Sequence, residues 1–268
     1  IGSVTDEPLV NKTMQGVEVV HHVAAAFREL NVPNSYYHQV NVGGTETVLK
    51  AAEAAGADGI TAHLREDRRH ISDDDITNLM AAIRVPLNLE MAATEEMLGI
   101  ALRHKPHAAC IVPEKRQERT TEGGLDAADG VDQLVPYVTA LKDAGIRVSL
   151  FIEPDRGQLE AAVKLRAPVV ELHTGAYCEA KGEERERQFR RIDEAARTAE
   201  KLKLECHAGH GLTFDTVGAV AAIPTIIELN IGHFLIGEAI FGGLESAIKR
   251  MRALMDKARA EASGERSA

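Results

Sequence analysis

The sequence of 268 residues contains no tryptophan, few aromatic residues and only three cysteines. Three cysteines far apart in a chain do not form the disulfide framework of a small secreted domain, and they favour a reducing compartment. No apolar run approaches the ~18 residues that a membrane-spanning helix needs, and the sequence does not begin with a charged and then apolar leader. We therefore expect a cytoplasmic protein that has no membrane partner.

Positive charge is also scarce, because 31 Lys and Arg side chains face 41 Asp and Glu side chains and leave a net charge of -10. Nucleic acids and anionic membranes are held by clustered cationic groups, so neither is expected as the main partner. A basic pocket can still capture a small anion. With 44% apolar residues and no break in composition, we expect one domain over 1–268, with an irregular extension at 1–15 and a frayed tail at 257–268.

Short apolar runs alternate with amphipathic stretches from residue 45 onward. The apolar runs predict strands at 59–63, 86–90, 108–112, 147–152, 169–173, 203–207 and 224–230. The amphipathic stretches predict helices over 45–55 and 72–83, from 94, and over 131–141, 158–165, 192–202 and 244–255. Either 16–20 or 38–42 can be the first strand. About eight strands, each followed by a helix, predict an α/β protein with a closed parallel (β/α)8 TIM barrel and an additional N-terminal segment; a doubly wound open sheet is the alternative.

Polar side chains stand at or just past the carboxyl ends of the predicted strands. They are His63, Glu90, His173, His210 and His233. Barrels build their sites on this face from several strands at once, so these side chains are expected to meet in one pocket.

The loop after His63 is rich in cationic groups: Arg65, Arg68, Arg69 and His70. Guanidinium forks match phosphate oxygens and imidazole can move a proton near neutral pH, so this loop suits a phosphorylated ligand. A solvated charged loop is the alternative.

Two glycine-flanked histidines follow later in the chain, at 209–211 and at Gly232-His233. Late barrel loops often bind phosphate through backbone N–H groups, and glycine allows the close approach. The long hydrophilic connection at 114–125 closes with paired glycines and is either a lid or a surface excursion.

A metal site is an alternative use of several of these side chains. Its ligands would come from His63, His70, His207, His210, His233, Cys206 and Glu90. Arg65 would repel a cation there, and histidines beside glycines suit anions better, so no metal is expected. We interpret His104 and His107 as surface residues, and Cys110 and Cys178 as packing thiols.

Seven runs of the sequence match one known family in order. They are 55–61, 63–71, 87–92, 120–126, 171–175, 208–212 and 228–233. Through them the chain, from about residue 51 to 255, resembles the pyridoxine 5′-phosphate synthase family, the barrel enzymes that form the vitamin B6 ring. The resemblance implies a transferase-class condensation of 1-deoxy-D-xylulose 5-phosphate with 3-amino-2-oxopropyl phosphate. The products are pyridoxine 5′-phosphate, phosphate and water. It also implies homo-oligomers built from dimers.

The resemblance assigns roles to individual residues. It implies His63 and Glu90 as general bases, His210 as general acid and Glu171 as a carboxylate that stabilises charge. It implies Arg65, His70 and Thr120 as binders of the deoxyxylulose phosphate, and Gly211, Gly232 and His233 as binders of the amino-ketone phosphate. The 114–125 loop matches the one that closes over substrate. The scheme needs neither a metal nor an organic cofactor, because iminium formation itself makes the neighbouring carbon acidic.

The first fifty residues depart from that family. Its first strand carries an Asn-x-Asp-His pattern and then an arginine, whereas the nearest match here keeps His22 but has Val19 and His21 at the other two positions. Arg28 is an unaligned arginine, and His207 stands where the family has asparagine. A barrel that binds a phosphorylated metabolite with impaired or altered turnover is therefore the alternative, although a pure binding protein has little use for the retained acid/base groups. A one-substrate phosphosugar isomerase or aldolase is a third hypothesis.

Overall fold

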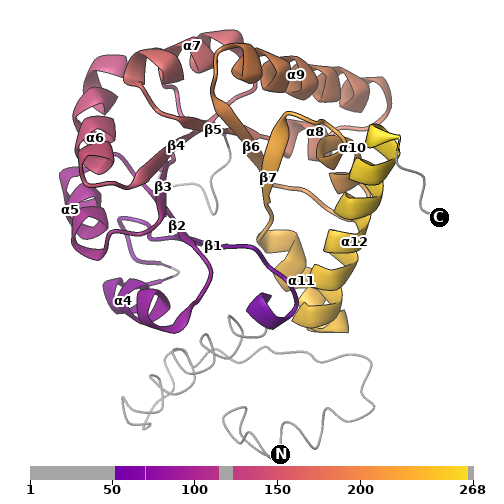
Figure 1. Ribbon diagram of the computed structural model, residues 1–268, viewed down its shortest axis with the longest axis horizontal. Helices are drawn as coiled ribbons and strands as arrows, with labels where there is room; N and C mark the ends of the chain where they lie inside the picture. The colour runs from indigo at the N-terminus through magenta and orange to yellow at the C-terminus, as the bar shows by residue number, and fades with distance from the viewer. Residues whose placement is uncertain (1–51, 70, 115–122, 265–268) are drawn as a thin grey trace, which may run out of the picture.

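The computed structural model describes residues 52–69, 71–114 and 123–264. Within these residues, seven parallel strands form one sheet whose strand order follows the chain. The strands are β1 (Ile60–His63), β2 (Leu87–Met91), β3 (Ala108–Ile111), β4 (Arg147–Ile152), β5 (Val169–His173), β6 (Glu205–Gly209) and β7 (Ile226–Asn230). The strands curl around a common centre, with the helices outside them (Figure 1). This confirms the α/β class and the barrel type. The candidates for an eighth strand, 16–20 and 38–42, lie outside the described residues, as does the 1–15 extension.

The strands follow the predicted positions closely, because each is a short apolar run bounded by a polar turn. Those at 147–152 and 169–173 have the predicted bounds, and the bounds of the others shift by at most two residues. Of the helix predicted at 45–55, residues 52–54 are described as helical. The remaining helices are α4 (Asp73–Ala82), α5 (Glu95–His104), α6 (Val131–Asp143), α7 (Arg156–Leu165), α8 (Gly175–Glu179), α9 (Gly182–Lys201), α10 (Val217–Ala221), α11 (His233–Gly242) and α12 (Leu244–Ser263).

Side-chain caps fix where several helices begin. Thr94 Oγ1 accepts a hydrogen bond from the Met97 N–H at the start of α5, and the Asp155 side chain caps α7 in the same way. Ser72 and Asp75 form a reciprocal capping box at α4. These caps satisfy N–H groups that a helix leaves without internal partners.

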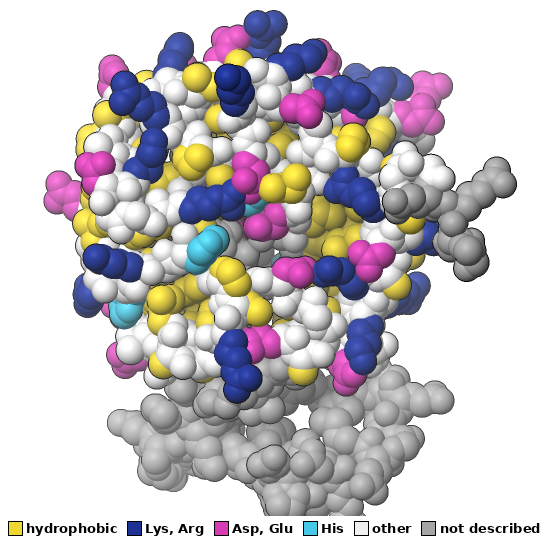
Figure 2. Space-filling model, viewed as in Figure 1, with side chains coloured by type: hydrophobic (Ala, Val, Ile, Leu, Met, Phe, Trp, Pro, Cys, Tyr) yellow, Lys and Arg dark blue, Asp and Glu magenta, His cyan; other side chains and the backbone are white. Residues whose placement is uncertain are grey.

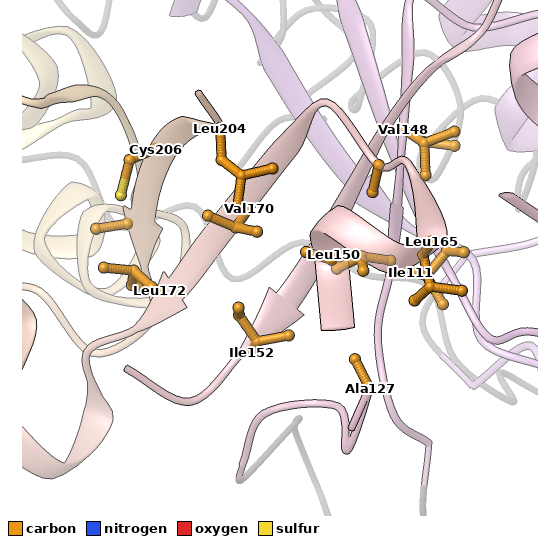
Figure 3. Packing of buried hydrophobic residues seen from close by; sticks show 14 of the residues in the cluster. Ile111, Ala127, Val148, Leu150, Ile152, Leu165, Val170, Leu172, Leu204 and Cys206 are labelled. Atoms are coloured by element: carbon orange, nitrogen blue, oxygen red, sulfur yellow. The ribbon is translucent and has the colours of Figure 1, made fainter. Parts of the chain in front are cut away.

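The two faces of the sheet differ in character because successive side chains of a strand point to opposite sides. Val148, Leu150 and Ile152 of β4, with Val170 and Leu172 of β5, are buried on the outer face against the helices (Figure 3). The alternate positions, which include Ser149, Glu171 and His173, point to the inside of the curled sheet. The hydrophobic core therefore lies between sheet and helices, which leaves the interior free for polar chemistry.

Three helices, α8, α10 and α11, were not predicted. The first two are single turns, and α11 is apolar nearly all round, so it lacks the amphipathic period that reveals a helix. The prediction of a frayed tail from Lys257 does not match residues 257–263, because α12 continues to Ser263. Arg259 holds this part of α12 by donating to the carbonyl oxygens of Ile223 and Ile226.

No helix in the described part of the chain is long and apolar enough to cross a membrane. β1 and β7 are the two edge strands of the sheet, yet their inward side chains meet, since Thr61 Oγ1 lies 2.7 Å from Asn230 Oδ1. The curl of the sheet thus brings the two ends of the described strand order together around one interior.

Candidate active site

The interior of the curled sheet holds a cavity of about 1180 Å³. Among its lining residues are His63, Arg65, Glu90, Glu171, His210, Gly211, Gly232 and His233. Of the other predicted residues, His173 is not part of the lining, although its ring lies 5.2 Å from that of His210, and His70 and Thr120 lie outside the described residues. Acidic, basic and histidine side chains gather at the middle of the face seen in Figure 2, inside the ring of helices. The structure therefore brings together side chains that are far apart in the sequence.

His63, at the end of β1, is held between two carboxylates. Its Nε2 lies 2.9 Å from Glu114 Oε1, and its Nδ1 lies 3.7 Å from Glu90 Oε2. Glu114 Oε2 also accepts the Glu66 N–H at 3.0 Å. Both ring nitrogens of His63 thus face groups that can exchange a proton with it.

The two carboxylates beside His63 differ in their affinity for protons. Burial raises the pKa of Glu90, and the charge of His63 opposes this only in part. Burial also acts on Glu114, but hydrogen bonds from His63 and the Glu66 N–H outweigh it and lower the pKa of Glu114. Glu90 is therefore the carboxylate suited to take up a proton near neutral pH, and Glu114 the one suited to orient the ring.

The cationic loop divides its arginines between two tasks. The Arg65 side chain is 2% exposed, lines the cavity and lies 3.4 Å from Asp67. Arg69 pairs with the same Asp67, while Arg68 pairs on the outside with Asp73 and Glu96. Arg65 thus lines the cavity, whereas Arg68 is engaged in ion pairs away from it.

Glu171 of β5 is fixed at the centre of the cavity. Its Oε2 accepts a hydrogen bond of 2.9 Å from Asn230 Nδ2, and Cys110 Sγ lies 3.9 Å from the same oxygen. Its Oε1 occupies the space that a side chain on Gly209 would need, because a Cβ there would come within 2.2 Å of it. Burial, then the negative charges of Glu90 and Glu228, raise the pKa of Glu171 well above its ordinary value. This shift favours the neutral carboxyl group of Glu171, which can donate a hydrogen bond.

His210 has quite different neighbours from those of His63. Its ring lies 5.2 Å from that of His173 and 6.3 Å from that of Phe151, centroid to centroid. Burial, followed by the charges of His173 and His233, lowers the pKa of His210. His173 is itself tied to Glu153, with Nδ1 2.8 Å from Oε1.

The backbone of His210 is held in a conformation that non-glycine residues seldom adopt, with φ of 77°. The buried Thr174 hydroxyl lies 2.7 Å from the Gly209 carbonyl oxygen and 2.5 Å from that of His210. Gly211 follows with φ of 80°. A non-glycine residue such as His210 stores strain in this conformation, and such residues gather at functional sites; here the conformation aims the imidazole into the cavity.

Three residues of the site were missed or left without a role by sequence reasoning: Glu114, Glu153 and Asn230. Glu114 and Glu153 lie shortly after β3 and β4, and Asn230 ends β7. The rule that found the other candidates, a polar side chain at the carboxyl end of a strand, applies to these as well. Nothing in the sequence marks them as partners of His63, His173 and Glu171.

Within residues 52–69, 71–114 and 123–264, no group of three or more His, Cys, Asp or Glu is arranged to hold a metal ion, and His70 of the alternative metal set lies outside them. Cys206 points into the core on the helix side of β6 (Figure 3). The two ring nitrogens of His207 instead face Glu205 at 2.7 Å and Glu228 at 3.2 Å. All three cysteines are free thiols, and Cys110 and Cys206 are buried.

The first fifty residues have a likeness of their own. Residues 1–61 match the model of the 3-beta hydroxysteroid dehydrogenase/isomerase family, less than a quarter of the chain. This range covers the part of the sequence that departs from the barrel family.

The fold is similar to that of solved barrel enzymes of low sequence identity. The 3-keto-L-gulonate-6-phosphate decarboxylase from Vibrio cholerae aligns with a TM-score of 0.56 at 10% identity, over 81% of this chain and 92% of that one. The phosphoribosyl anthranilate isomerase from Thermus thermophilus aligns with a TM-score of 0.54 at 14% identity, over 80% and 95%. At such identities the likeness supports the fold alone.

Residues 40–257 match the family model described as pyridoxal phosphate biosynthesis protein PdxJ. A pyridoxine 5′-phosphate synthase from Rhodospirillum rubrum is 72% identical over 210 residues, which are 78% of this chain and 84% of that protein. The synthase from Zymomonas mobilis is 66% identical over 210 residues, 78% and 82% of the two chains. With its strand-end groups in one cavity and this match over most of its length, the chain belongs to the PdxJ family of vitamin B6 biosynthesis.

Proposed function

We propose that the chain is a pyridoxine 5′-phosphate synthase that joins 1-deoxy-D-xylulose 5-phosphate to 3-amino-2-oxopropyl phosphate. The observation that carries the proposal is the set of acid/base groups around one cavity. Their surroundings raise the pKa values of Glu90 and Glu171 and lower that of His210. Each step of this reaction moves a proton at a different atom of one bound intermediate, so a single acid/base pair would not suffice. The name shared by relatives of high identity supports the same reaction.

The roles are those that the resemblance to the family implies, and the surroundings of each group support them. The amine of one substrate attacks the ketone of the other, and loss of water gives an iminium that makes the adjacent carbon acidic. Glu90, buried and with a raised pKa, takes a proton from carbon, and His63, oriented by Glu114, serves as the second base. The neutral Glu171 donates a hydrogen bond to oxygen that becomes negative during these transfers. His210 gives a proton to the leaving oxygen.

The two phosphate groups are assigned to different parts of the cavity wall. Arg65, almost wholly buried, binds the deoxyxylulose phosphate together with His70 and Thr120. The amino-ketone phosphate is bound at Gly211, Gly232 and His233, where the N-terminus of α11 offers N–H groups to an anion. One phosphate is eliminated as inorganic phosphate, and the ring closes with loss of water.

The proposal extends to the setting of the enzyme. It acts without a metal or organic cofactor, as a cytoplasmic homo-oligomer built from dimers, and residues 1–268 form a single domain. It binds small phosphorylated substrates and neither nucleic acid nor membrane. The acidic composition supports the last point, because it leaves little cationic surface for polyanions.

The alternative function is a barrel that binds a phosphorylated metabolite with impaired or altered turnover. The departure of the first fifty residues, which match a different family, favours it. It predicts ligand binding without product.

The test is to incubate the purified chain with both phosphorylated substrates and assay pyridoxine 5′-phosphate. Glu90→Gln and single-substrate incubations are the controls. Product that requires both substrates and is lost in the variant supports the synthase. Binding of either substrate without product supports the alternative and refutes the synthase.

A further inference from the structure

A chain of side-chain hydrogen bonds crosses the interior beneath the acid/base groups. Asn88 Nδ2 lies 3.5 Å from Thr61 Oγ1, the Thr61 hydroxyl lies 2.7 Å from Asn230 Oδ1, and Asn230 Nδ2 lies 2.9 Å from Glu171 Oε2. The four residues come from β2, β1, β7 and β5. The chain therefore reaches the Glu171 carboxyl group in the wall of the cavity.

We propose that Asn230 is a positioning residue that holds the Glu171 carboxyl group in a single orientation, with its proton on Oε1. The proposal deepens the proposed function, because the role of Glu171 in turnover rests on it. Asn230 acts through Glu171 and is not itself assigned to touch the substrates.

The first step of the argument is the direction of the Asn230 amide. An amide offers an acceptor at one end and two donors at the other, and the two ends have nearly the same shape. The Thr61 hydroxyl donates to Oδ1, so the donor end faces Glu171. The other amide hydrogen points to Glu228 Oε1, at 3.4 Å. Both donors are thus directed at carboxyl groups, and the Thr61 hydroxyl, which accepts from Asn88, donates to the acceptor end of the amide.

The second step is the position of the proton on Glu171. In a neutral carboxyl group, the oxygen that carries the proton is the donor and the other is the better acceptor. Asn230 Nδ2 and Cys110 Sγ both contact Oε2, which makes Oε2 the carbonyl oxygen. Oε1 lies over Gly209, where a Cβ would come within 2.2 Å. Because Gly209 has no side chain, there is room at the cavity wall for Oε1 and its proton.

The third step is the charge around the carboxyl group. Glu90 of β2, Cys110 of β3, Glu228 of β7 and, behind Glu228, His207 of β6 are its titratable neighbours. Burial and the carboxylates raise the pKa of Glu171, whereas the hydrogen bond from His207 lowers the pKa of Glu228. Asn230 consequently donates one hydrogen to a neutral carboxyl group and the other to an ionised one. These two hydrogen bonds persist only while the Asn230 amide keeps the same orientation.

A matched pair of variants at Thr61 tests the direction of the amide. Thr61→Val keeps the shape but removes the hydroxyl that fixes Asn230, whereas Thr61→Ser keeps the hydroxyl. We expect kcat to fall about tenfold in Thr61→Val, in line with the loss of one neutral hydrogen bond. Both KM values should stay within about twofold, and Thr61→Ser should restore kcat. Equal effects of the two variants would overturn the proposal, as would a loss confined to KM.

A double-mutant cycle tests whether Asn230 acts through Glu171. Asn230→Ala should lower kcat strongly alone and hardly at all in a Glu171→Gln background, because the group that it positions is already altered. It should also move the alkaline limb of the kcat profile to higher pH, because the donor that favours the ionised form of Glu171 is gone. A purely structural role predicts additive losses and an unmoved limb, and either result would refute the proposal.

Infrared difference spectroscopy gives a readout that does not need turnover. The carbonyl stretch of a protonated Glu171 is identified as the band that disappears in Glu171→Gln. In Asn230→Ala and Thr61→Val the band should shift to higher frequency, because the carbonyl oxygen loses a donor, and Thr61→Ser should restore it. An unshifted band refutes the proposal even if the protein is an active synthase. A shift in a protein without synthase activity supports the positioning and contradicts only the proposed function.

Discussion

The two histidines proposed for proton transfer sit in opposite surroundings, on the two sides of one cavity. His63, on the β1 to β3 side, has a carboxylate at each ring nitrogen, Glu114 at 2.9 Å and Glu90 at 3.7 Å. His210, on the β5 to β7 side, lies among rings and other imidazoles, and its pKa is lowered. The same residue type therefore gains two proton-transfer roles from its neighbours, which is how one fold performs acid and base chemistry together.

The largest effect is expected when each of these histidines is removed. His63→Asn and His210→Asn should each lower kcat by about 10²- to 10⁴-fold, the usual loss for an acid/base group. Pre-steady-state measurement of the first condensation intermediate separates the two sides. We expect the intermediate to accumulate in one variant and not in the other. If both variants stop at the same step, the division of roles between the two sides is wrong.

The next effect concerns the centre of the cavity, where the two sides meet. Gly209→Ala would place a Cβ 2.2 Å from Glu171 Oε1 and 3.0 Å from the Asn230 carbonyl oxygen. The carboxyl group must move, and we expect kcat to fall about 100-fold, as a displacement of about 1 Å can cause. Gly99→Ala in α5 is the matched control, because a Cβ there meets nothing within 4 Å. It should leave kcat unchanged and raise the thermal midpoint slightly. Equal kcat in both variants would contradict the assigned position of Glu171.

The supporting carboxylates provide a finer comparison of the two sides. Glu114→Gln removes the charge beside His63, and Glu153→Gln removes the charge beside His173, which only neighbours His210. We expect a loss in kcat of about tenfold for the first, since a charge-assisted hydrogen bond to a proposed base is lost. The second should lose less. Steady-state kinetics of the two variants, measured side by side, gives the two losses in kcat. A larger loss in Glu153→Gln than in Glu114→Gln would contradict the prediction.

The smallest effect is a shift in a pH profile. His210 has a lowered pKa in the free protein, so it becomes protonated at a lower pH than an ordinary imidazole. Acid catalysis by His210 therefore predicts that kcat/KM rises as the pH falls through this lowered pKa. In the complex, a bound phosphate dianion favours the charged His210 ring. The limb due to His210 should therefore lie at higher pH in the kcat profile than in the kcat/KM profile. Both profiles, measured with wild type and with His210→Asn, test this. Coincident limbs, or a limb that persists in the variant, would contradict it.

The sequence predicted most of what local physics determines. The apolar runs of β4 and β5 and the caps at Ser72 and Thr94 can be identified without tertiary information, and the strand ends predicted Glu90 and three of the site histidines. The apolar α11 could not be found in this way, because no periodic face marks it. The roles of the site residues came from the resemblance to a family, and they remain proposals.

What the sequence could not predict are the pairings across the cavity. Arg65 and Arg68 look equivalent in the sequence, but Arg68 has a φ of 53° and its side chain pairs on the outside while that of Arg65 is buried. The partner of His63 is Glu114, 51 residues later, and only the curl of the sheet brings the two together. Such pairings depend on the register and curvature of many strands at once.

The contact between Thr61 and Asn230 has a consequence for the folding of the enzyme during its synthesis. The two residues are separated by 169 positions in the chain, and a contact of such long range forms only after the segments between them have been placed. During synthesis the chain is made from its N-terminus, so Glu171 leaves the ribosome well before the amide that fixes it. Until β7 arrives, the carboxyl group has no Asn230 donor at Oε2. Catalytic competence is therefore acquired late in synthesis, and a partly made chain cannot begin the chemistry early.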